Sequence, residues 1–278
     1  MLLTLAASSL RALLAPDRSG NARLRLADLP RYAREELGLF GLNFSTALLA
    51  GSDYESLDRL REAADRAACP CLVLVESEPL DFASEDDDLA EAAVERLVRV
   101  ARAASRLGCN SASVMLGGVT DEPGVDRSVE RLKQVIRVAD RLELNILLMS
   151  ASGLTADPDS LTALIKRIGG FRIGTMPDFE LAGLAPDPVL YLRRLTPYAA
   201  AVTAATRRGK PVKKAGGPDE IAELARLART VQSVGYTGTL ALDYRGDGDP
   251  VPVLLKARAA LEAALGPEAA RPAEAPPE

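Results

Sequence analysis

Hydrophobic and polar residues alternate along the chain in two recurring patterns. Short apolar runs are separated by longer stretches in which apolar residues recur every three or four positions. The short runs are typical of buried parallel strands, and the longer stretches are typical of amphipathic helices that cover a sheet. The pattern predicts eight strands, at Leu2–Ala6, Phe40–Phe44, Cys71–Val75, Ser111–Leu116, Leu144–Met149, Phe171–Thr175, Tyr198–Thr203 and Gly238–Asp243.

Residues that satisfy free backbone groups mark the predicted helix boundaries. Asp157-Pro158, Asp187-Pro188 and Asp249-Pro250 each place an acid before a proline, which favours a helix N-terminus. Gly108 and Gly235 follow amphipathic stretches, where glycine ends a helix by adopting the left-handed conformation. Eight alternating strands and helices predict a single closed (β/α)8 barrel, with a doubly wound open sheet as the alternative.

The chain of 278 residues is long enough for one such barrel, which commonly takes about 250 residues. We expect the barrel to span residues 1–265 and the Pro-, Ala- and Glu-rich residues 266–278 to form a disordered tail. The apolar opening lacks a charged start and is interrupted by Arg11, which favours a first strand over a secretion signal. No apolar stretch approaches the roughly 20 residues that a membrane span needs.

Charge and cysteine usage narrow the class of partner. The formal net charge of -5 and the pI near 5.1 argue against a general nucleic-acid binder, which needs a basic face. A small neutral or anionic ligand, or a protein partner, fits better. Cys69, Cys71 and Cys109 show no metal-binding spacing and are expected to be buried, reduced thiols of a cytoplasmic protein. The oligomeric state stays open, a homo-oligomer included.

The sequence contains no histidine. Histidine is the commonest metal ligand and the usual side chain for proton transfer near neutral pH. Its absence excludes Ser/His/Asp and Cys/His triads. Any proton transfer must therefore use other side chains.

Four stretches resemble the sugar phosphate isomerase/epimerase family, the xylose-isomerase-like TIM barrels related to endonuclease IV. They are LPRYAREELGL (Leu29–Leu39) continuing into GLNFSTALL, CPCLVLVES around the third strand, IGTMPDFEL (Ile173–Leu181) and GYTGTLALDYRGDGDP (Gly235–Pro250). The resemblance extends to about Leu265. It implies a site for a small carbohydrate at the carboxyl ends of the strands.

The resemblance also implies a metal site, built in that family from a fifth-strand acid, a sixth-strand aspartate, usually a seventh-strand histidine and an eighth-strand glutamate. Asp178 and Asp243 match the sixth- and eighth-strand positions, whereas Ser150 and Thr203 stand where the other two ligands are expected. Two carboxylates and two hydroxyls replace the water shell of a hard divalent ion poorly. We therefore expect no tightly bound metal; weak Mg²⁺ or Mn²⁺ binding would need Glu76 as a third acid.

Asp178, Asp243 and Glu76 are the candidate catalytic residues. Isomerisation and epimerisation need a base and an acid next to a carbonyl, and two facing carboxylates can serve as both. The developing oxyanion would need a metal or another cation beside it. The structural alternatives are that Asp178 caps a turn and that Asp243 pairs with Arg245 or with an arginine of the loop after the seventh strand.

The loop after the seventh strand, TRRGKPVKK, is the densest cationic segment. Its guanidinium groups could bind a phosphate or carboxylate in bidentate fashion, and a solvated basic loop is the alternative. The full set of candidate substrate-binding residues is Asn43, Ser150, Thr203, Arg207, Arg208, Lys210 and Tyr244.

Three functional hypotheses remain open. The first is an isomerase, epimerase or lyase that acts on a small sugar or sugar acid without a tightly held metal. The second is a catalytically inactive pseudoenzyme that serves ligand binding, regulation or assembly. The third is an interaction module that uses the outer helices or the tail. An endonuclease role is disfavoured because that relative needs several metal ions and histidines.

Overall fold

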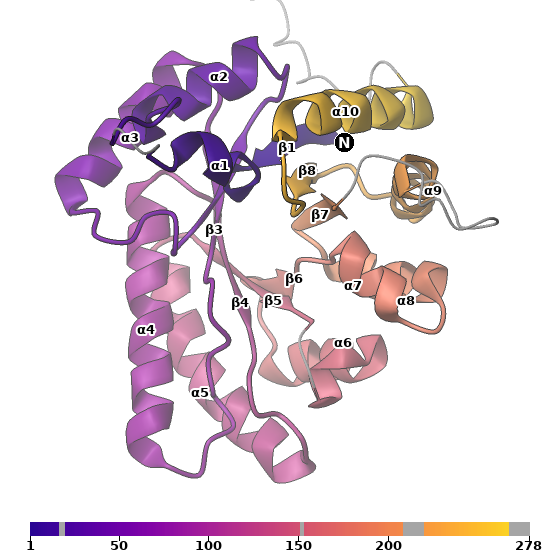
Figure 1. Ribbon diagram of the computed structural model, residues 1–278. Helices are drawn as coiled ribbons and strands as arrows, with labels where there is room; N and C mark the ends of the chain where they lie inside the picture. Colours follow the sequence, from indigo (N-terminus) through magenta and orange to yellow (C-terminus); the bar gives the residue numbers. More distant parts are fainter. Residues whose placement is uncertain (17–19, 151–152, 208–219, 267–278) are drawn as a thin grey trace, which may run out of the picture.

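The computed structural model describes residues 1–16, 20–150, 153–207 and 220–266. Within these residues, eight parallel strands form one curled sheet surrounded by helices (Figure 1). The strands are β1 Leu2–Ala6, β2 Leu42–Ser45, β3 Cys71–Val75, β4 Ser111–Met115, β5 Asn145–Met149, β6 Ile173–Thr175, β7 Ala201–Thr206 and β8 Thr239–Tyr244.

Strand order confirms the barrel and rules out the doubly wound alternative. The order is β6-β5-β4-β3-β2-β1-β8-β7, so each strand lies beside its neighbour in the sequence and β1 also pairs with β8. Parallel bridges from Thr175 to Ala199 and from Asp178 to Thr203 join the two remaining edges. Both edges of the sheet are therefore connected, as a closed (β/α)8 barrel requires.

Six of the eight strands differ from the sequence prediction at one or both ends, and β7 differs the most. β7 begins three residues later than predicted because Thr196–Tyr198, which contains Pro197, forms a short 3₁₀ turn before it. β6 is shorter than predicted because Phe171 lies fully exposed after two glycines with positive φ. As a result, Thr203 lies inside β7 and not at its carboxyl end.

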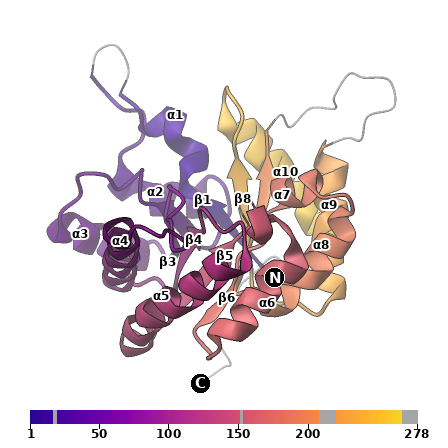
Figure 2. The same cartoon turned by 90° about the horizontal axis from the view of Figure 1, so that it is seen from below.

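The helices surround the central strands, as the view from below shows (Figure 2). They are α1 Arg11–Leu14, α2 Leu29–Glu35, α3 Tyr54–Arg66, α4 Asp87–Arg106, α5 Glu122–Arg141, α6 Pro158–Ile168, α7 Phe179–Leu184, α8 Pro188–Leu195, α9 Glu220–Ser233 and α10 Pro250–Leu265.

The predicted helix boundaries are confirmed. Asp157, Asp187 and Asp249 cap α6, α8 and α10, and each accepts a hydrogen bond from a first-turn backbone N–H. Gly108 and Gly235 have φ values of 79° and 89°, the left-handed region that glycine tolerates.

The hydrophobic core has two parts. The larger part fills the space between the sheet and the helices, and a smaller part consists of Val73, Leu147, Met149, Met176 and Ala201. Because alternate residues of a strand point to opposite faces, the smaller cluster represents the inner face of the sheet.

The three cysteines are buried and unpaired, as predicted. Burial raises the pKa of the Cys69 and Cys71 thiols to about 12, so both stay protonated near neutral pH. No helix among the described residues has the length and apolar character needed to cross a membrane.

Candidate active site

Arg245 lies at the centre of a cluster of acids at the carboxyl ends of β6, β7 and β8. Its Nε donates to Asp243 Oδ2 at 2.7 Å, its Nη1 donates to Glu180 Oε2 at 2.6 Å, and its Nη2 donates to Asp178 Oδ2. Burial alone would lower the pKa of Arg245, but the charges of Asp178 and Asp243 raise it above its usual value. The guanidinium therefore remains charged while it binds three carboxylates.

The backbone at the end of β8 directs Arg245 toward these acids. Its N–H donates to the Thr206 carbonyl at 2.8 Å, which holds it against the end of β7. A Cβ at Gly246 would lie 1.8 Å from the Arg207 carbonyl oxygen. Glycine at this position thus permits the close approach of the two chain segments that positions the guanidinium.

Asp178 is fully buried and both of its carboxylate oxygens accept hydrogen bonds. Oδ1 caps α7 by accepting from the backbone N–H groups of Glu180 and Leu181, and Oδ2 accepts from Arg245. Burial raises the pKa of Asp178, and the opposing charge of Arg245 lowers it only in part. The predicted capping alternative for Asp178 is confirmed.

Asp243 is more accessible because it lines a cavity at the barrel mouth. Its Oδ2 accepts from Arg245, as the pairing alternative predicted, and its Oδ1 lies 3.4 Å from the hydroxyls of Ser8 and Ser9. The cavity has a volume of about 70 Å³. Its lining residues are Ala6, Ser8, Asn43, Phe44, Ser45, Val75, Met149, Met176, Thr203, Asp243 and Arg245.

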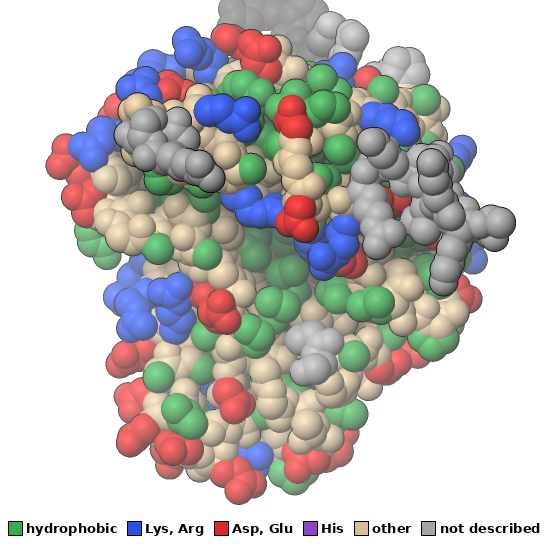
Figure 3. Space-filling model, viewed as in Figure 1, with side chains coloured by type: hydrophobic (Ala, Val, Ile, Leu, Met, Phe, Trp, Pro, Cys, Tyr) green, Lys and Arg blue, Asp and Glu red, His purple; other side chains and the backbone are tan. Residues whose placement is uncertain are grey.

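Two further polar side chains of this cavity have no hydrogen-bond partner among the described residues. They are the amide of Asn43, at both of its polar atoms, and the hydroxyl of Thr203. Each residue is only 3% exposed. Buried polar groups are normally paired, so these two are available to bind a ligand. Side chains of both charges surround a hollow near the centre of the face shown in Figure 3.

Two other predicted substrate-binding residues point away from the cavity. The Ser150 hydroxyl donates to the Thr155 carbonyl at 2.9 Å. Tyr244 lines a separate surface depression with Arg11 and Gly248, as expected for the strand neighbour of an inward-facing Asp243. Neither side chain lines the mouth cavity.

Arg207 also belongs to the acid cluster. Its Nε donates to Glu180 Oε1, which is the oxygen that Arg245 leaves free. Its backbone N–H donates to Glu220 Oε1 at 2.6 Å. The other two predicted basic ligands, Arg208 and Lys210, lie outside the described residues.

Glu76 lies apart from the central cluster. It is 1% exposed and pairs with Arg96 of α4 at 2.7 Å, and Thr46 Oγ1 donates to its Oε1 at 3.0 Å. Burial alone would raise the pKa of Glu76, but hydrogen bonds from Arg96, the Glu78 backbone and Thr46 hold it below its usual value. The structure thus directs Glu76 toward a helix and not toward Asp178 and Asp243.

Replacing Glu76 with glutamine is expected to lower the free energy of unfolding by about 1–2 kcal/mol at pH 7, because charged hydrogen bonds are lost. A lowered pKa stabilises the folded state above the unfolded-state pKa and loses this contribution as pH falls through the folded-state value. The difference from wild type should therefore shrink below about pH 4.5. Urea denaturation of both proteins between pH 7 and pH 3.5 measures this difference in stability. A difference that does not change with pH would contradict the lowered pKa of Glu76.

The comparison with known families assigns the fold. The family model for xylose isomerase-like TIM barrels matches residues 35–265 of the sequence. The chain belongs to this family. None of the curated proteins compared with the sequence matches it.

Solved structures of two sugar epimerases and of a dehydratase share the fold. An L-ribulose 3-epimerase is 16% identical with a TM-score of 0.75, covering 95% of each chain. A D-allulose 3-epimerase from Methylomonas sp. is 11% identical with a TM-score of 0.73, covering 95% of this chain and 98% of that one. A probable 3-DHS dehydratase from Bacillus anthracis is 15% identical with a TM-score of 0.69, covering 93% and 98%. At such identities the likeness establishes the fold and not the activity.

The described residues do not fit the divalent metal that the family resemblance implies. Asp178 and Asp243, which match two ligand positions, both accept hydrogen bonds from Arg245. Ser150, at the fifth-strand position, is bound to a backbone carbonyl. Among the described residues, no group of three or more His, Cys, Asp or Glu side chains could hold a metal ion. With a guanidinium already between the carboxylates, a second cation there would meet charge repulsion.

Proposed function

We propose that the protein binds a small sugar or sugar acid at the carboxyl-terminal mouth of the barrel and isomerises or epimerises it without a tightly bound divalent metal. One observation carries the proposal: Asp243 and Arg245 line the same cavity as two buried polar side chains that have no partner among the described residues. An acid, a cation and free hydrogen-bonding groups therefore converge on one small cavity at the barrel mouth.

The proposed chemistry uses Asp243 as the base. Its carboxylate takes a proton from the carbon next to the sugar carbonyl, and the electron pair of the broken C–H bond forms an enediolate. The N–H groups that Arg245 does not donate to acids stabilise the enediolate oxygen. For isomerisation, the proton of the neighbouring hydroxyl moves to the enediolate oxygen, and Asp243 returns its own proton to the former carbonyl carbon. For epimerisation, a solvent water delivers a proton to the opposite face of the original carbon, and the proton held by Asp243 passes to solvent.

The pseudoenzyme hypothesis remains the second candidate, and the environment of Asp178 favours it. Asp178 is fully buried, and its oxygens are occupied by the α7 backbone and by Arg245. It therefore offers no free second acid next to Asp243. An enzyme that needs two mobile acid–base groups would lack one, whereas a protein that only binds a sugar would not.

Binding and turnover can be separated in one experiment. We expect isothermal titration with aldoses, ketoses and aldonic acids in the presence of EDTA to find a sugar that binds. Incubation of that sugar with the protein in D₂O should place deuterium on the carbon next to the carbonyl, as detected by NMR. Asp243→Asn should retain binding but abolish deuterium incorporation.

The outcomes distinguish the candidates. Binding without deuterium incorporation would support the pseudoenzyme. Binding that appears only after Mn²⁺ is added would contradict metal independence. The absence of binding by every sugar tested would contradict the proposal as a whole.

A further inference from the structure

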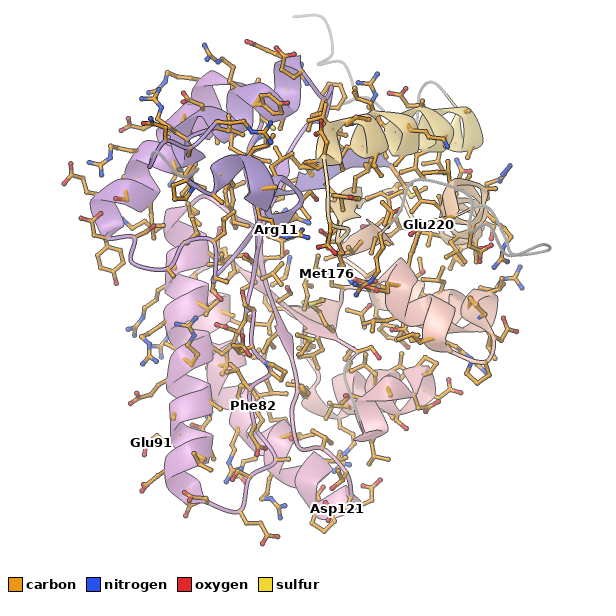
Figure 4. The ribbon with its side chains drawn as sticks, viewed as in Figure 1. Arg11, Phe82, Glu91, Asp121, Met176 and Glu220 are labelled. Atoms are coloured by element: carbon orange, nitrogen blue, oxygen red, sulfur yellow. The ribbon has the colours of Figure 1, made fainter. Side chains whose placement is uncertain are left out.

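The two walls of the mouth cavity differ in chemistry. One wall, from β2, β7 and β8, carries Asn43, Thr203 and Asp243. The other wall, from β3, β5 and the segment after β6, carries Val75, Met149 and Met176. In Figure 4 Met176 lies at the centre of the molecule, between the strands and α7. A ligand in this cavity therefore meets hydrogen-bonding groups on one side and apolar groups on the other.

The two methionines of the apolar wall, Met149 and Met176, lie at one level of the barrel, and Met115 packs behind them without lining the cavity. Met115 of β4 is the register partner of Met149 in β5, and Met176 follows β6, which pairs with β5. Met149 and Met176 belong to the inner apolar cluster, and Met115 packs against it. A thioether donates no hydrogen bond and accepts only weakly, so this wall cannot replace the water lost by a buried hydroxyl.

The size of the cavity limits what can enter it. A volume of about 70 Å³ corresponds to about two water molecules, at roughly 30 Å³ each in the liquid. This is room for one end of a sugar and not for a whole hydroxylated ring. The buried end must present polar groups to Asn43 and Thr203 and a carbon without a hydroxyl to the methionines.

We infer that the preferred ligands are deoxy sugars, with a methyl or methylene group placed against Met149 and Met176. This inference rests on the proposed function and specifies its substrate class. A hydroxylated analogue would bury one oxygen against the thioethers without a partner. An apolar pocket discriminates by up to about 100-fold against a ligand that carries one additional hydroxyl. We therefore expect the deoxy sugar to bind about 10- to 100-fold more tightly than its hydroxylated analogue.

The test compares sugars that differ by a single hydroxyl. 1-Deoxy-D-fructose is matched with D-fructose, and 1-deoxy-D-tagatose with D-tagatose, because the deoxy carbon of these ketoses lies next to the carbonyl. Dissociation constants are measured by isothermal titration calorimetry. In the wild-type protein the deoxy member of a pair should bind at least about tenfold more tightly. Met176→Gln, which keeps the chain length and adds an amide, should reduce this ratio to about threefold or less, since the amide can pair with the hydroxyl.

Met176→Leu is the matched control, because it keeps the wall apolar and should retain the preference. Met149→Gln provides a second polar variant if Met176→Gln does not fold. Equal affinity for both members of each pair, or a ratio unchanged by the glutamine variants, would overturn the inference and leave the proposed function intact. Absence of binding by all four sugars, when other sugars bind, would overturn the deoxy preference alone; absence of binding by every sugar would overturn both.

Discussion

Replacing Arg245 with methionine is expected to lower the free energy of unfolding by about 3–5 kcal/mol at pH 7. Removing one partner of a buried ion pair leaves the other charge uncompensated, and Asp178 is fully buried. Asp243 and Glu180 lose the same partner. Urea denaturation followed by circular dichroism measures the change, which exceeds what most single substitutions produce.

Arg207→Met is the matched control for this prediction. Arg207 also pairs with Glu180, but its side chain is 61% exposed, and exposed ion pairs contribute little to stability. A similar loss in both variants would contradict the central role of Arg245. Adding Asp178→Asn to Arg245→Met should recover part of the stability, since it removes the unpaired buried charge.

The pH dependence of the Arg245→Met variant follows from Asp178. Burial already raises the pKa of this carboxyl with Arg245 present, and without the guanidinium it should rise further. A carboxyl with a raised folded-state pKa destabilises the folded state increasingly as pH rises above the unfolded-state value. The loss of stability should therefore be larger at pH 7 than at pH 5.

The sequence predicts the barrel because each of its signals is local. Apolar runs specify buried strands, and acid-proline pairs such as Asp157-Pro158 specify helix starts through bonds within a few residues. Ends of strands are less well specified. The predicted seventh strand begins three residues too early because Tyr198, Ala199 and Ala200 are as apolar as a strand end, although Tyr198 belongs to a 3₁₀ turn.

The candidate site was predicted only in part because its contacts join distant segments. Asp243 and Arg245 are two residues apart, so their pairing was open to prediction from the sequence. The contact between Arg245 and Asp178 spans 67 positions and exists only once the barrel is closed. Glu76 likewise turns toward Arg96 of α4, and no local pattern distinguishes that orientation from one toward the mouth. The methionine wall was missed because apolar residues on strands are normally only core.

Replacing Asn43 with valine is expected to stabilise the fold and to weaken carbohydrate binding by about 5- to 30-fold. The amide of Asn43 is buried and has no partner among the described residues, so removing it relieves a desolvation penalty of about 1 kcal/mol or more. Valine is also a better strand former. Because one hydrogen bond to a ligand contributes about 1–2 kcal/mol, its loss corresponds to the expected change in affinity.

A gain in stability together with a loss of sugar affinity would distinguish a ligand-binding group from a packing defect. Residues that serve function are often not optimal for stability. Ser113→Ala is the matched control: the Ser113 hydroxyl is also buried without a partner among the described residues, but it does not line the mouth cavity. We expect Ser113→Ala to be more stable than wild type in thermal denaturation and to bind the sugar with unchanged affinity in calorimetry. If Asn43→Val behaved in the same way, Asn43 would have no part in binding, and the polar wall of the cavity would have to be assigned to Thr203 and Asp243 alone.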